Sequence, residues 1–211
     1  MAHIATNPYL PGWEYIPDGE PHVFGDRVYV YGSHDAPEGT AYCPGDYVCW
    51  SAPVDDLGSW TFEGTIWRKE DDPANVDRTG YGAPDVCQGA DGRFYLYYFT
   101  LSMTSGCVMS VAVCDEPAGR YRYLGPIAKP DGSPFAGEEG WGMPFDPAVL
   151  PCGDGGLLAL LWVWRQEAEL AHARMFHGGR LRGAARRRYA HDGRDTQASG
   201  SGSDAGGGHG F

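Results

Sequence analysis

Short apolar and aromatic segments, separated by turns rich in glycine and aspartate, recur along the chain up to about residue 165. Tyr, Trp, Phe and Val dominate these segments, and such residues favour strands over helices. The segments with the strongest pattern are Tyr29–Tyr31, Tyr47–Ala52, Phe94–Tyr98, Cys107–Val113 and Leu157–Trp162. The pattern therefore predicts an all-β chain made of many short strands.

These strands belong to a unit that repeats at a spacing of about 65 residues. The Gly25-Asp26-Arg27 turn before one aromatic strand matches Asp91-Gly92-Arg93 before the next, and Gly153–Gly156 precedes a third. Each turn is of the kind that closes a tight hairpin. Four antiparallel strands in each unit are typical of a propeller blade, and an ordinary β-sandwich is the alternative. The repeat favours the propeller, with about two and a half blades present.

Composition limits the classes of partner. The net charge of −12 argues against nucleic acid and against an anionic membrane, and it fits an enzyme for neutral substrates such as sugars. The six cysteines form no CxxC pair, which argues against a zinc ribbon. We expect no metal site and no cofactor. The sequence has no secretory signal and no segment long enough to span a membrane, so we expect a cytoplasmic protein with reduced cysteines.

The composition changes after about residue 165. Acidic residues dominate before this point, whereas arginine dominates after it, and the end is rich in Gly and Ser. We therefore predict a partial propeller domain over residues 1–165 and an Arg/Gly/Ser-rich tail over 166–211. The tail has two interpretations, a disordered linker or a shifted reading frame in a GC-rich gene.

An acidic residue lies next to proline at the start of each unit, in Glu20-Pro21, Pro84-Asp85 and Asp146-Pro147. Such dipeptides are common turn formers, so each one alone has a structural explanation. Three of them, placed before three similar strands, instead indicate acid/base chemistry at a shared centre.

These motifs, in this order, resemble glycoside hydrolase family 43, which contains β-xylosidases, α-arabinofuranosidases and arabinanases. The resemblance covers residue 7 to about residue 165 and rests on four stretches: Asn7–Gly12, Glu20–Asp35, Ala83–Val86 and Phe145–Val149. It implies a five-bladed β-propeller, here incomplete, and hydrolysis of xylose- or arabinose-containing oligo- or polysaccharides with inversion. Inversion needs a base that activates water and a protonated acid on the opposite face of the sugar.

The resemblance also implies roles for individual residues. Asp146 matches the aspartate that tunes the pKa of the general acid. The general base of the family is usually an Asp before Pro, and here that place holds Glu20, with Asp18 two residues upstream as the rival. Asp85 falls in the turn where the family has a Trp-Ala-Pro-like sequence, although Gly82 replaces the Trp, and it is expected to line the pocket.

Three further side chains are candidates for substrate binding. Trp13 and Trp141 lie next to the acidic motifs and are candidate platforms for stacking on a sugar, while His34 is a candidate pocket group. No acidic residue after residue 165 stands in a Glu-Gly-Pro-like context, so no general acid is assigned and we expect impaired catalysis. The alternative is a carbohydrate-binding fragment without activity, or the non-functional product of a truncated gene.

Overall fold

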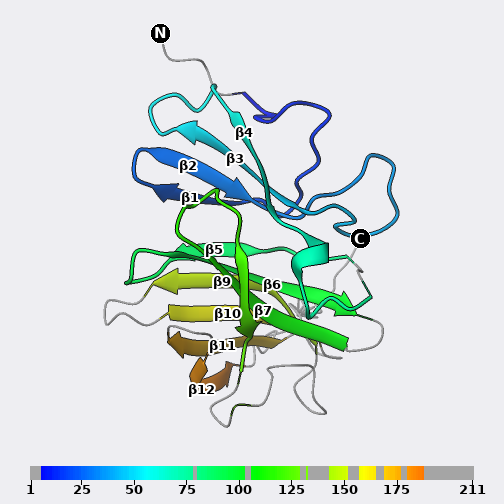
Figure 1. Ribbon diagram of the computed structural model, residues 1–211, viewed down its shortest axis with the longest axis vertical. Helices are drawn as coiled ribbons and strands as arrows, with labels where there is room; N and C mark the ends of the chain where they lie inside the picture. The colour runs from blue at the N-terminus through cyan, green and yellow to red at the C-terminus, as the bar shows by residue number, and fades with distance from the viewer. Residues whose placement is uncertain are drawn as a thin grey trace, which may run out of the picture.

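The computed structural model describes residues 6–77, 80–102, 106–128, 132, 143–151, 157–164, 169–176 and 180–187. Within these ranges the chain forms three antiparallel sheets of four strands, and neighbours in each sheet are neighbours in sequence. Figure 1 shows the sheets one after another, from blue through green to orange. The first sheet contains β1 (Glu20–Phe24), β2 (Arg27–Tyr31), β3 (Tyr47–Pro53) and β4 (Thr61–Trp67). The second contains β5 (Asp85–Gln88), β6 (Phe94–Ser102), β7 (Gly106–Cys114) and β8 (Arg122–Pro126), and the third β9 (Met143–Pro151), β10 (Leu157–Trp164), β11 (Glu169–Phe176) and β12 (Arg180–Arg187).

Two of the predicted glycine turns connect the first two strands of their sheets, and the third, over residues 153–156, lies outside the described residues. In the first sheet Phe24 pairs with Arg27, which leaves Gly25 and Asp26 as a two-residue hairpin loop. Gly25 has a φ of 65°, a conformation that glycine adopts without the steric penalty of a Cβ atom. Gly92, which precedes β6, has a φ of 82°. The predicted hairpins are therefore confirmed at both positions.

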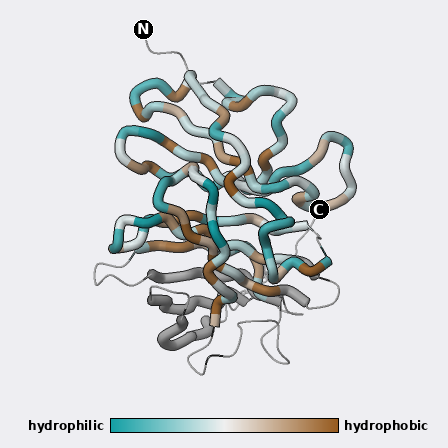
Figure 2. Tube along the Cα trace, viewed as in Figure 1, coloured by the Kyte–Doolittle hydropathy of each residue, from teal (hydrophilic) through white to brown (hydrophobic). Residues whose placement is uncertain are grey.

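The middle sheet is covered on both faces, and β6 shows this in its sequence. Successive residues of a strand point to opposite faces. Leu96 and Tyr98 pack in a core cluster with Tyr31 and Trp67 of the first sheet. Tyr95, Tyr97 and Phe99 belong to a second cluster that includes Val149 of the third sheet. Because both faces are buried, β6 is a nearly continuous aromatic run, and Figure 2 shows apolar stretches along the strands in the middle of the molecule.

The third sheet extends past residue 165, where the sequence predicts the propeller domain to end. Strand β11 pairs with β10, and β12 pairs with β11, so residues 169–176 and 180–187 are both part of the sheet. The two interpretations of the tail, a disordered linker and a shifted reading frame, both stay predictions.

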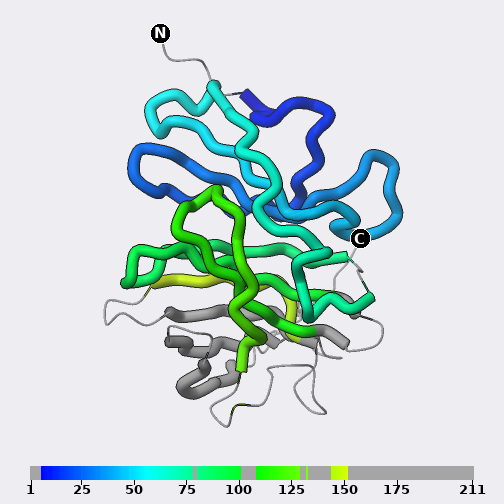
Figure 3. Tube along the Cα trace, in the orientation of Figure 1, coloured from blue at the N-terminus to red at the C-terminus, as the bar shows by residue number. Residues whose placement is uncertain are grey.

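The segment that precedes β1 runs along the first sheet, and it is dark blue in Figure 3. Two aromatic contacts attach it: the ring centroids of Tyr9 and Trp60 are 5.1 Å apart, and those of Trp13 and Trp50 are 6.0 Å apart. In the described part of the chain the helical residues are confined to a short 3-10 turn, Lys69–Asp71, and no helix there is long and apolar enough to cross a membrane.

Candidate active site

A cavity of about 490 Å³ lies where the starts of the three sheets come together. Asp18 contributes from the turn before β1, Gly82 and Ala83 from the segment before β5, and Asp146 from β9 itself. The remaining walls come from the connection between β2 and β3, from β6 and from aromatic residues. The complete lining consists of Pro17, Asp18, Ser33, Asp35, Tyr42, Tyr81, Gly82, Ala83, Phe99, Phe145 and Asp146.

Asp146 enters this cavity because of a β-bulge. Strand β10 pairs Trp162 with Phe145 and Leu161 with Pro147, so Asp146 is the extra residue that has no partner. Its φ of 47° is unusual for a residue other than glycine, although aspartate tolerates this region better than most. Burial raises the pKa of the Asp146 carboxyl group, a hydrogen bond from the Ala83 backbone N–H opposes the shift, and the charge of Asp18 raises the pKa further.

Asp18 faces the same cavity from a turn that packs tightly on β2. Its φ is 55°, so both carboxylates of the pair are carried on left-handed backbone. A Cβ atom built on Gly32 would lie 2.9 Å from the Pro17 carbonyl oxygen and 3.1 Å from the Gly19 Cα. The missing side chain at Gly32 is therefore what lets the Asp18 turn approach the end of β2. The Asp18 side chain belongs to an exposed residue, so water can reach it.

Glu20 interacts electrostatically with Asp18 but does not line the cavity. It is the first residue of β1, where it pairs with Tyr31. Partial burial raises the pKa of the Glu20 carboxyl group, and the charges of Asp85 and Asp18 raise it further, while His22 lowers it. The structure thus brings the two rival bases into one electrostatic environment and places Asp18, not Glu20, in the lining.

Asp85 is buried and is absent from the residues that line the cavity. Its Oδ1 lies 2.6 Å from His22 Nε2 and accepts a hydrogen bond of 2.7 Å from the Val86 N–H. Its Oδ2 accepts a hydrogen bond of 2.5 Å from the Val149 N–H. The carboxylate that the sequence placed in the pocket wall therefore joins the three sheets in the structure.

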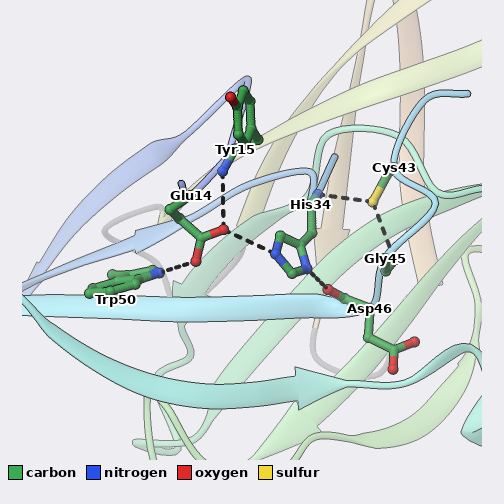
Figure 4. Close-up of polar contacts among 7 residues, drawn as sticks. All are labelled: Glu14, Tyr15, His34, Cys43, Gly45, Asp46 and Trp50. Carbon is green, nitrogen blue, oxygen red and sulfur yellow. Dashed lines mark hydrogen bonds and ion pairs between the residues drawn. The ribbon is translucent and has the colours of Figure 1, made fainter. Parts of the chain in front are cut away.

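His34 also lies outside the lining, in a polar network that Figure 4 shows. Its Nε2 lies 3.0 Å from Glu14 Oε1, and its Nδ1 lies 3.1 Å from the Asp46 carbonyl oxygen. Trp50 Nε1 donates to Glu14 Oε2 at 2.8 Å. The Glu14 side chain is only 4% exposed, so it anchors the segment before β1 to the first sheet. His34 has a structural position here, between the pocket residues Ser33 and Asp35.

Of the two predicted tryptophan platforms, the structure describes only Trp13. Trp13 is 67% exposed and tilts against Trp50, but it is absent from the lining. Trp141 lies outside the described residues. Cys43, Cys49, Cys87 and Cys114 are free and buried. Among the residues that the structure describes, no group of three or more His, Cys, Asp or Glu side chains is placed to hold a metal ion.

Several cavity residues were missed in the sequence. Asp35 lines the cavity, and its Oδ1 accepts a hydrogen bond of 2.7 Å from the Cys43 N–H. Tyr42, which directly precedes Cys43 in the sequence, is 81% exposed and lines the cavity. Phe99 occupies the space beside Gly82, where a Cβ atom would lie 1.5 Å from the Phe99 ring. The position of Asp35, four residues after the end of the Tyr29–Tyr31 strand, was an available signal, whereas Tyr42 and Phe99 gave none.

Comparison with known proteins identifies the class. A xylosidase/arabinosidase from Thermoclostridium stercorarium is 57% identical over 149 residues, which are 70% of this chain and 31% of the relative. Xylosidase/arabinosidase 43A from Humicola insolens is 31% identical over 163 residues, which are 74% of this chain and 44% of the relative. The crystal structure of CoXyl43, a GH43 beta-xylosidase/alpha-arabinofuranosidase from a compost microbial metagenome, superimposes with a TM-score of 0.65 at 22% identity, over 87% of this chain and 62% of that one. No protein-family model matches the chain.

The N-terminal part of this chain therefore belongs to glycoside hydrolase family 43. Its sheets form an incomplete β-propeller, which confirms the predicted fold class and the predicted family. The chain spans 31–44% of the length of these two curated relatives.

The raised pKa of Asp146 predicts a stability effect that depends on pH. The folded chain holds this proton more tightly than the unfolded chain, so between the two pKa values the free energy of unfolding falls as the pH rises. Asp146→Asn removes the ionisation and tolerates the same backbone conformation. We expect this variant to unfold at a higher temperature than the wild type at pH 7. Its free energy of unfolding is expected to be larger by about 1.4 kcal/mol for each unit of pKa shift. The advantage shrinks as the pH approaches about 4.

Circular dichroism at several pH values measures this effect. Asp26→Asn is the matched control, because Asp26 is an exposed turn residue, and we expect it to leave the unfolding temperature unchanged. An Asp146→Asn curve that follows the wild type at every pH would contradict the interpretation.

The Glu14 network predicts that a buried, hydrogen-bonded carboxylate contributes more to stability than an exposed ion pair. Glu14→Gln leaves the His34 and Trp50 donors with a weaker partner in a buried site, and we expect a loss of about 1.5–3 kcal/mol. The control is Glu70→Gln, which breaks the exposed pair between Glu70 and Arg68 and is expected to change stability by less than about 1 kcal/mol. Urea unfolding of both variants tests the difference, and equal losses would show that Glu14 is not an anchor.

Proposed function

We propose that this protein is a glycoside hydrolase that acts on xylose- or arabinose-containing glycans with inversion. The observation that carries the proposal is that Asp18 and Asp146, from the starts of two different sheets, line one cavity and interact electrostatically. Paired carboxyl groups on a shared cavity are what glycosidic hydrolysis requires. The descriptions of the relatives as xylosidase/arabinosidase support the substrate class.

Within this proposal Asp18 is the general base. A base must reach water at the site of the reaction; both Asp18 and Glu20 are exposed, but Asp18 lines the cavity, whereas Glu20 begins a paired strand outside the lining. Asp146 tunes the electrostatics of the reaction, because its half-buried carboxyl group couples to Asp18 and sits on a strained bulge that fixes its direction. The geometry thus favours Asp18 over Glu20 for proton abstraction.

The walls of the cavity suit a sugar. Tyr42, Phe99 and Phe145 present aromatic surface, and Ser33 adds a hydroxyl group. Mostly apolar walls with a few well-placed polar groups are typical of small-molecule sites. The rings of Phe99 and Phe145 hold each other in place, with centroids 6.3 Å apart at 63°. A pentose ring between these walls would lie against the two carboxylates.

We also propose that protonation of the leaving group is impaired in this chain. The third carboxylate of the lining, Asp35, accepts the Cys43 N–H and the Asp35 N–H donates to the Tyr15 carbonyl oxygen, so it is engaged in holding the loop. That leaves the described cavity with a base and a tuning carboxylate. Loss of general-acid catalysis lowers the rate by about 10²–10⁴-fold.

Substitution of the acidic residues tests the proposed roles. With 4-nitrophenyl β-xyloside and 4-nitrophenyl α-arabinofuranoside as substrates, we expect Asp18→Asn to lower kcat/KM by about 10²–10⁴-fold. Glu20→Gln, which changes a residue outside the lining, is expected to have an effect of less than about tenfold. If Glu20→Gln is the more damaging change, Glu20 is the base. No turnover by the wild-type chain with either sugar contradicts the proposed activity.

The impaired acid predicts a strong dependence on the leaving group. An acidic phenol such as 2,4-dinitrophenol leaves an aryl glycoside as the phenolate, without a proton from the enzyme, whereas 4-methoxyphenol needs a proton to leave. We therefore expect kcat to fall steeply from the first xyloside to the second. A flat dependence would show that a working acid protonates the leaving group, and the claim of impairment would then be wrong.

A further inference from the structure

Asp85 is a buried carboxylate that the proposed mechanism does not use, and it is saturated with donors from three different sheets. Its side chain is 4% exposed. The donors are His22 Nε2 of β1 at 2.6 Å, the Val86 N–H of β5 at 2.7 Å and the Val149 N–H of β9 at 2.5 Å. Each of these strands is the first strand of its sheet. One carboxyl group therefore ties together the three strands whose starts surround the cavity.

The positions of these donors connect Asp85 to the two carboxylates of the cavity. His22 follows Asp18 by four residues, in the strand that begins directly after the Asp18 turn. Val149 follows Asp146 by three residues in β9, just beyond the bulge that directs Asp146 into the cavity. A change in either hydrogen bond moves one carboxylate relative to the other, because strands transmit such displacements along their length.

Asp85 is unsuited to the role of a substrate ligand. Both of its oxygens are engaged within the protein, and it does not line the cavity. A purely structural hydrogen bond is the other explanation, and it predicts a loss of stability without a specific loss of kcat. The centroid of the His22 ring lies 5.8 Å from that of Phe24, in a stacked arrangement, and 6.2 Å from that of Tyr31. These two contacts orient the ring, and its Nε2 points toward Asp85. The charge of Asp85 also contributes to the raised pKa of Glu20.

We propose that Asp85 is a positioning residue, which sets the distance and orientation between Asp18 and Asp146 by holding β1, β5 and β9 together. This role rests on the proposed hydrolase function. Displacement of reacting groups by about 1 Å can lower a rate by about 10²-fold without changing the binding of the substrate. A positioning role is therefore expected to affect kcat much more than KM.

Asp85→Asn tests the proposal, because the amide keeps the size of the side chain but presents an NH₂ donor to one of its three donors. We expect kcat with 4-nitrophenyl β-xyloside to fall by about 10–100-fold while KM stays within about twofold. The matched control is Asp72→Asn, because Asp72 is also a buried carboxylate, and its donors, which include the Ala74 N–H and the Tyr81 hydroxyl, do not come from β1 or β9. We expect Asp72→Asn to lower the unfolding temperature without the loss of kcat. Equal losses of kcat in the two variants would overturn the positioning role.

A second pair of variants covers the case in which Asp85→Asn does not fold. His22→Gln keeps an N–H donor toward Asp85, whereas His22→Leu removes it. We expect His22→Leu to reproduce the loss of kcat and His22→Gln to recover a large part of it. If the two variants have the same kcat, the hydrogen bond is not what positions the carboxylates.

An experiment without substrate separates this inference from the proposed function. Carboxyl NMR titration of the wild type and of Asp85→Asn, or of His22→Leu in its place, reports the coupling between Asp18 and Asp146, and amide hydrogen exchange reports the Val149 N–H. We expect Asp85→Asn to change the Asp146 titration and to speed exchange at Val149 by about 10-fold or more. Unchanged titration and exchange would overturn the positioning role. If Asp85→Asn changes the Asp146 titration but the wild-type chain shows no turnover, the positioning role stays intact and the hydrolase function is refuted.

Discussion

The burial of the middle sheet on both faces is the constraint on which the rest of this structure depends. Strand β6 sends Leu96 and Tyr98 to one neighbour and Tyr95 and Tyr97 to the other, so each side of the sheet needs a partner. Aromatic side chains supply much of the burial, and they bury more area per residue than other types. The first and third sheets therefore pack on opposite faces of the middle sheet. The cavity lies where the first strands of the three sheets begin.

A polar group at such a junction must be satisfied, because a buried carboxylate without donors is strongly unfavourable. Asp85 fulfils this condition with one side-chain donor and two backbone donors, each from a different sheet. The same principle governs the Glu14 network, where a side chain that is 4% exposed receives donors from Trp50 and His34. Polar side chains thus specify how the sheets and the first segment meet, while aromatic contacts supply most of the area.

The two carboxylates of the cavity are carried on strained backbone. Asp18 and Asp146 both have positive φ, and such residues persist only where the surrounding structure holds them. Gly32 permits the tight turn at Asp18, and the bulge opposite Leu161 directs Asp146 out of the regular alternation of β9. A regular strand at Asp146 would place its side chain according to the pleat and not according to the needs of the site. The strained backbone at Asp18 and Asp146 is therefore what directs their side chains into the cavity.

The sequence by itself determined the strands, the glycine turns, the repeat and the family, because alternation and turn chemistry are local and the acid-proline motifs are contiguous. It also predicted a carboxylate set of Glu20, Asp85 and Asp146, with Asp18 as the rival of Glu20 for the role of base. Only the tertiary structure decided that Asp18 and not Glu20 lines the cavity, that Asp85 and His34 are internal ties, and that Asp35 and Tyr42 are walls. The physical reason is that a residue's direction depends on bulges, on partners from other sheets and on the packing of glycines such as Gly32, and none of these is encoded in neighbouring residues alone.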